Sequence, residues 1–159
     1  MIREEFLPES DLPGRNGKIL SKPVLIPADT SSHEVIDASA MEEYIKNNRS
    51  ILFVQQLFSQ IGKSGKTDSE IYKKAGIDRR LFSKFRANKK YTPAKKTVIA
   101  LCLALELPRT EADLLLSSAG YSLSSSDDFD LAIAFCIEKK VYNLQAVNVM
   151  LYQLGFQVF

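Results

Sequence analysis

The chain has few of the residues from which metal centres, disulfide frameworks and catalytic sites are usually built. Its 159 residues include two cysteines, Cys102 and Cys136, and one histidine, His33. Each cysteine stands inside an apolar stretch, and none of the three has neighbours at metal-ligand spacing, which argues against a zinc site or a disulfide framework. We therefore expect no metal, no cofactor and no catalytic residue. Two unpaired cysteines are typical of a cytoplasmic protein.

Long apolar runs are also missing. No segment approaches the ~18 uninterrupted apolar residues of a membrane-spanning helix, and the first ten residues, MIREEFLPES, have no apolar signal core. A composition of 45% hydrophobic and 25% charged residues is ordinary for a globular domain. A chain of this length can bury a core without disulfides or a structural metal. These features predict a globular protein with no membrane partner.

Residues 1–40 differ from the rest of the chain in their lack of helical periodicity. Four of the six prolines and two of the seven glycines fall in this segment. We expect an extended N-terminal arm, with KPVLIPAD at residues 22–29 as its one adhesive apolar stretch.

From about residue 41 onward, apolar residues recur at helical spacing. The sequence Thr-Asp-Ser-Glu at 67–70 is a capping box that predicts a helix closed by Gly76, and Asp78 is a favourable N-cap for the next helix. Thr110 is expected to cap a later helix. The predicted inward stripes are Val54, Leu57, Phe58 and Ile61; Phe82 and Phe85; Val98, Leu101, Cys102 and Leu105; Ala112, Leu115, Leu116 and Ala119; Phe129, Ala132, Ile133, Cys136 and Ile137; and Leu144, Val147, Leu151 and Leu154. The pattern predicts an all-α fold of about seven helices.

One short motif, GKSGKT at residues 62–67, ends like a phosphate-binding loop. A P-loop also needs a glycine five residues before the second glycine, where this chain has Gln60, and it must follow a strand. Here the motif follows a helical stripe. We interpret it as a loop between helices.

Basic residues are concentrated in one part of the chain. Residues 73–96 hold ten lysines and arginines against one acid, a net charge of +9, whereas residues 1–40 carry −3 and residues 97–159 carry −4. Concentrated charge of one sign repels itself and is usually presented to an anionic partner. A solvated lysine-rich face is the alternative interpretation.

The order of these signals between residues 67 and 107 resembles the lambda-repressor-like, or XRE-type, helix-turn-helix family. A capped helix ends in Ala-Gly at 75–76, a short turn leads to Asp78 and a second helix, and a turn with Pro93 precedes an Ala/Leu-rich helix. The resemblance covers roughly residues 48–121. It implies a core of about five helices over residues 41–121, followed at 122–159 by a C-terminal helical pair packed on that core or forming an interface.

The region from about 41 to 159 is also similar to a helical module at the C-terminus of some bacterial macrodomain proteins, which belong to the ADP-ribose-binding class. The shared features are Asp-Arg-Arg-Leu-Phe-Ser-Lys at 78–84, Tyr91, Pro93, Lys96, Ala-Gly-Tyr at 119–121 and Phe-Asp at 129–130. This sequence has no macrodomain, so the similarity implies no ADP-ribose chemistry.

The helix-turn-helix resemblance implies a non-enzymatic DNA-binding regulator of transcription. Its recognition helix, near residues 78–87, would lie in the major groove of double-stranded DNA, with flanking lysines on phosphates. The residues expected to contact DNA are Arg79, Arg80, Lys84, Arg86, Lys89, Lys90, Lys95 and Lys96.

Three positions depart from the family pattern and favour a second hypothesis, a protein-interaction module that keeps the helix-turn-helix as scaffold. Asp68 stands where family members often have a phosphate-anchoring Gln, Tyr72 replaces a small residue, and Leu81 is at an outward position. Tyr72 and Leu81 would equally serve to thicken the core. The interface residues of this alternative are Tyr72, Leu81, Leu151, Phe156 and Phe159, and its partner is a second copy or another protein bound through the C-terminal helices.

Overall fold

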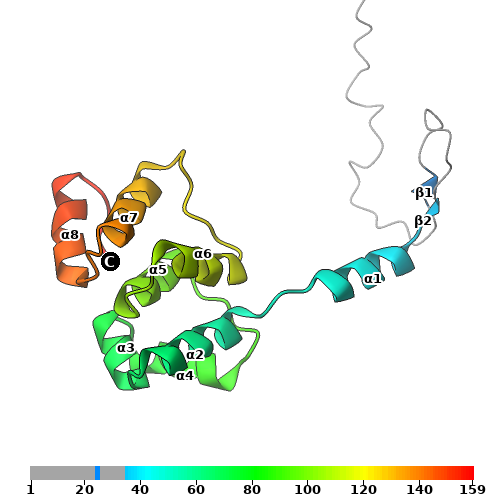
Figure 1. Ribbon diagram of the computed structural model, residues 1–159, viewed down its shortest axis with the longest axis horizontal. Helices are drawn as coiled ribbons and strands as arrows, with labels where there is room; N and C mark the ends of the chain where they lie inside the picture. Colours follow the sequence, from blue (N-terminus) through cyan, green and yellow to red (C-terminus); the bar gives the residue numbers. More distant parts are fainter. Residues whose placement is uncertain (1–23, 26–34) are drawn as a thin grey trace, which may run out of the picture. The chain divides into compact units, whose positions relative to one another are not determined.

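The structure, a computed structural model, describes residues 24–25 and 35–159 of the chain. The chain divides into two units, residues 1–49 and residues 50–159 (Figure 1). The second unit consists of seven helices without a strand, which confirms the predicted all-α fold.

The described part of the first unit is a strand pair and one helix. Strand β1 (Val24–Leu25) pairs antiparallel with β2 (Val35–Ile36). Helix α1 (Ala38–Asn48) follows, and its N-cap Asp37 accepts a hydrogen bond from the Ala40 amide at 2.9 Å. Every side chain of α1 is exposed. Most of the segment expected to form an extended arm lies outside the described residues.

The second unit consists of α2 (Phe53–Ser64), α3 (Asp68–Lys74), α4 (Arg79–Ala87), α5 (Lys95–Ala104), α6 (Arg109–Ser118), α7 (Asp128–Glu138) and α8 (Leu144–Gln153). Helix α5 lies at the centre and contacts α3, α6 and α8, while α2 packs on α6 and α7 packs on both α6 and α8 (Figure 1). Residues 98–104 of α5 are all buried, as expected for a helix surrounded by others.

The capping box and the Asp78 cap are confirmed. Thr67 Oγ1 accepts from the Glu70 amide, and the Glu70 carboxylate accepts from the Thr67 amide at 2.7 Å. Gly76 has φ +64°, the left-handed conformation that glycine adopts without steric cost, and so ends α3. Asp78 accepts a hydrogen bond from the Arg80 amide at 2.6 Å and starts α4.

Two local predictions are wrong and a third is confirmed only in part. Helix α6 begins at Arg109 after Pro108, so Thr110 lies inside its first turn; the Pro108 carbonyl accepts the first helical bond, from Ala112. Leu154 is 65% exposed, because α8 ends at Gln153 and the helical stripe ends with it. In the 62–67 motif, residues 65–67 connect α2 to α3 as predicted, but the first three residues belong to α2, which ends at Ser64 with Gly65 as its C-cap (φ +66°).

Candidate nucleic-acid interface

Aromatic packing fixes the inner face of α4. Phe82 and Phe85 are buried with ring centroids 5.5 Å apart. Phe85 also packs edge-on against Phe53 of α2, with ring centroids 5.9 Å apart, and at a tilt of 45° against Tyr91 of the following loop, with centroids 5.5 Å apart. Aromatic pairs with such geometry add to the free energy of burial. The inner face therefore determines which side of α4 is turned to solvent.

The outer face of α4 is basic and carries no large apolar side chain. Arg80, Ser83, Lys84 and Ala87 are spaced i, i+3, i+4 and i+7, so they share one face of the helix, and all four are exposed. Within the described part of the chain, neither Arg80 nor Lys84 forms an ion pair. We call these four residues the α4 stripe. Because Ser83 and Ala87 have small side chains, this face of α4 can approach another surface closely while Arg80 and Lys84 contact it.

Further basic side chains lie on either side of the stripe. Arg79 is exposed at the first position of α4, and Lys89 and Lys90 are exposed in the turn that follows it. This turn is held by Asn88, which accepts a hydrogen bond from the Lys90 amide at 3.0 Å. Together with Arg86, which is exposed but paired, six of the eight predicted DNA contacts are therefore exposed along α4 and its following turn.

Arg86 is placed differently from the other predicted contacts. Its guanidinium donates to both carboxylate oxygens of Asp68 at 2.7–3.0 Å and lies 3.7 Å from the centroid of the Phe58 ring. Planar guanidinium groups suit both bidentate carboxylate pairing and stacking on an aromatic ring. Arg86 thus ties α4 to α2 and α3, and it neutralises Asp68, the acid that stands where helix-turn-helix proteins of the resembled family often have a phosphate-anchoring Gln.

Lys95 and Lys96, at the start of α5, also face protein groups. The Lys95 ammonium lies 2.6 Å from Asp130 Oδ2, a carboxylate only 3% exposed, which also accepts from the Ser124 amide at 2.8 Å. Lys96 Nζ lies 3.0 Å from Gln157 Oε1. The structure therefore joins both lysines to the α7–α8 region instead of presenting them with the α4 stripe.

Tyr72 and Leu81, two residues of the alternative interface, pack against the core and are half-buried. The Tyr72 ring lies 5.7 Å from that of Phe82. Their packing agrees with the interpretation that large side chains here thicken the core.

The remaining interface candidates lie near the end of the sequence. Leu151 is 1% exposed, so its assignment to a surface is wrong for this conformation: its position on the α8 stripe points it into the core. Phe156 and Phe159 are half-buried, with ring centroids 6.3 and 6.2 Å from that of Phe129.

The pattern of apolar residues did not predict the exposed apolar surface that α7 and α8 form. Leu131 and Phe135 of α7 are 47% and 53% exposed, and Leu154 at the end of α8 is 65% exposed. Phe135 and Leu154 line a hollow of about 310 Å³ between the two helices. The sequence feature that could have predicted this surface is the i, i+4 spacing of Leu131 and Phe135. Both residues lie outside the predicted inward stripe of α7.

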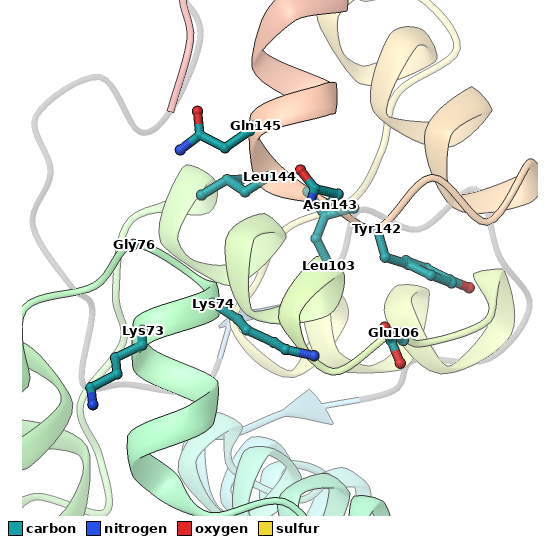
Figure 2. A pocket seen from close by; sticks show the side chains of 9 residues that line it. All are labelled: Lys73, Lys74, Gly76, Leu103, Glu106, Tyr142, Asn143, Leu144 and Gln145. Atoms are coloured by element: carbon teal, nitrogen blue, oxygen red, sulfur yellow. The ribbon is translucent and has the colours of Figure 1, made fainter.

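A second hollow, of about 330 Å³, lies between the end of α3, the α5–α6 turn and the start of α8 (Figure 2). Lys74 extends across it towards Glu106, whereas Lys73 points away. Glu106 is already paired with Lys66 at 3.1 Å, and the Tyr142 hydroxyl donates to the Leu107 carbonyl at 3.1 Å. Burial, with the Glu106 carboxylate as a smaller cause, raises the pKa of Tyr142. Glu106 and Tyr142, two of the polar groups that line this hollow, are therefore engaged in holding the helices.

Neither cysteine has the environment of a nucleophile. Both are buried, and burial raises the pKa of Cys102 to about 12, with Asp113 as a smaller cause. In the part of the chain that the structure describes, no cluster of histidine, cysteine, aspartate and glutamate side chains could hold a metal ion, and no helix has the length and apolarity needed to cross a bilayer. His33 lies outside the described residues.

Comparison of the chain with protein-family models, with curated proteins and with solved structures found no match.

Proposed function

We propose that the protein binds double-stranded DNA, with α4 in the major groove and neighbouring lysines on backbone phosphates. The observation that carries this proposal is the α4 stripe: an exposed helical face with Arg80 and Lys84 one turn apart and small residues beside them. The major groove admits an α-helix, and arginine or lysine can donate to guanine O6 and N7 there. The proposal assigns no catalytic step and places the protein in the cytoplasm, where unpaired cysteines stay reduced.

Arg79, Lys89 and Lys90 supply the sequence-independent part of this binding. Their exposed side chains flank the stripe, and lysine meets phosphate as a flexible point charge. Each phosphate contact adds about 0.9 to the slope of the logarithm of the binding constant against that of salt concentration. We therefore expect binding that weakens steeply as salt is added.

The test is a fluorescence-anisotropy titration of labelled duplex DNA at low and at moderate salt. Arg80→Ala or Lys84→Ala should each cost about 1–3 kcal/mol and relax the preference at one base pair, and Lys90→Ala should weaken binding to all sequences alike. Lys139→Ala, which removes an exposed lysine just after α7, is the matched control. Equal effects of Arg80→Ala and Lys139→Ala would show that α4 does not read DNA.

The acid at the start of α3 provides a second test. The Asp68 carboxylate is paired with the Arg86 guanidinium. Asp68→Gln therefore removes a negative charge and frees Arg86. The pair is partly exposed to solvent, so its loss should cost less than about 1 kcal/mol of folding free energy. DNA binding should tighten in the same titration, because the basic surface gains one net charge. Weaker binding by a folded Asp68→Gln protein would contradict this use of the surface.

A second candidate function, protein interaction, rests on the exposed apolar surface of α7 and α8. Helix α8 contains no charged residue, so two copies could meet along it without charge repulsion. Sedimentation of the protein with and without Phe135→Ser would test for a homodimer. A monomer at all concentrations would leave DNA binding as the better-supported function.

A further inference from the structure

The two lysines that begin α5 are held by groups far along the chain. Lys95 pairs with Asp130 of α7, and Lys96 Nζ lies 3.0 Å from Gln157 Oε1 and 3.4 Å from each of the Gln157 and Val158 carbonyl oxygens. Three acceptors around one ammonium occupy the directions in which it would donate to a phosphate. Both lysines are consequently half-buried.

Residues 157–159, which we call the strap, are fixed at two points. The Phe159 amide donates to Asn148 Oδ1 of α8 at 2.9 Å, and the Phe159 ring packs on Phe129. Lys96 Nζ lies 5.5 Å from the centroid of that same Phe129 ring. The strap therefore closes over Lys96, while Gln157 itself remains exposed to solvent.

The start of α7 adds negative charge on the same side. Asp127 caps the helix, Asp128 is its first residue and Asp130, the third, binds Lys95. Carboxylates at a helix start beside a lysine compete with phosphate for the ammonium group, and they also repel the phosphate.

We propose that the strap and the acidic start of α7 form an autoinhibitory cover over a phosphate-binding lysine, Lys96. This inference rests on the proposed DNA binding. With the cover closed, α4 and its neighbouring cations carry the binding. When the strap is displaced, Lys96 becomes available to the DNA backbone, and binding tightens without any change in the residues that read bases.

The test is a cycle of four proteins titrated with the same labelled duplex: the full chain, the chain lacking residues 157–159, and Lys96→Gln in each. Loss of the strap should tighten binding about 3- to 10-fold at low salt and steepen the salt slope by about 0.9, the value of one new phosphate contact. Lys96→Gln should change the affinity of the full chain less than about 2-fold and abolish the gain in the shortened chain.

The double variant Asn148→Ala/Gln157→Ala removes two strap contacts while keeping the aromatic ring of Phe159, and it should reproduce part of the gain if the deletion disturbs folding. Unchanged or weaker binding by folded strap variants overturns the cover, as does a Lys96→Gln effect of equal size in both chains. Arg80→Ala, measured alongside, separates the two proposals. If Arg80→Ala weakens binding and strap loss does not tighten it, only the cover is wrong. If no protein binds duplex DNA, both proposals are wrong.

Discussion

The ion pair between Lys95 and Asp130 should contribute to folding stability in a way that depends on which partner is removed. The two side chains lie 2.6 Å apart, but the Asp130 side chain is 3% exposed and that of Lys95 is 34% exposed. Removing the lysine leaves a buried carboxylate without its cation. Removing the carboxylate leaves a lysine that can turn into water. The two substitutions should therefore have unequal costs.

Breaking a fully buried pair from one side costs about 3–5 kcal/mol, and access of water past Lys95 reduces this here. We expect Lys95→Met to lower the free energy of unfolding by about 2–4 kcal/mol, since Asp130 keeps only its bond from the Ser124 amide. Asp130→Asn keeps an acceptor for that amide and should cost about 1 kcal/mol, because it loses mainly a half-exposed charge interaction.

The assay is urea unfolding followed by far-ultraviolet circular dichroism, with the dependence of the free energy on urea checked for constancy across variants. The double variant Lys95→Met/Asp130→Asn should be more stable than Lys95→Met alone, because the unpaired carboxylate is gone. A reversed order of the single variants, or costs that simply add in the double variant, would refute the reasoning from burial.

Three other predictions follow from packing and titration. Phe85→Ala should cost about 3–5 kcal/mol in urea unfolding, since the ring is fully buried among aromatic neighbours; a cost below about 1 kcal/mol would contradict that packing. Hydrogen bonds from the Thr67 amide and then its hydroxyl lower the pKa of Glu70 below its ordinary value of 4.5. The ionised Glu70 carboxylate therefore stabilises the fold fully above pH 4.5, and this stabilisation is lost as the pH falls through the lower pKa of the folded state. Glu70→Gln should flatten the acid side of a plot of folding stability against pH. An unchanged plot would contradict the role of Glu70 in the cap. Cys102 and Cys136 should react with a thiol reagent only on unfolding, since burial raises the pKa of each; fast labelling of the native protein would disprove this.

The helices and most of their inner faces were predictable from local signals. The capping box at 67–70 and the Asp78 cap act within a few residues, so composition and spacing suffice to find them. The missed start of α6 has a local cause as well: a proline immediately before a helix can serve at the cap position, although a threonine two residues later is the more familiar signal.

Pairing of charged side chains could not be predicted in the same way. The residues that engage Arg86, Lys95 and Lys96 lie 18, 35 and 61 positions away in sequence. Periodicity identifies a lysine as outward-facing but does not identify which distant helix it meets, because that depends on how α7 and α8 pack on α5. The same packing decides that Leu151 is buried while Tyr152, its neighbour, is exposed.

The tertiary contacts change what the +9 segment means for binding. Three of its ten cations, those at 86, 95 and 96, pair with acids or strap carbonyls, and the other seven are exposed. Arg86 is exposed as well, but its guanidinium is paired with Asp68. The negative net charge of residues 97–159 is therefore linked to the basic segment: one of its acids, Asp130, neutralises Lys95 at the start of α5. What this leaves along α4 is a narrower basic surface centred on Arg80 and Lys84. Because a uniform lysine-rich face would attract any polyanion, pairing of the cations at the start of α5 leaves α4 and its following turn with most of the exposed charge and favours partners that this helix can fit.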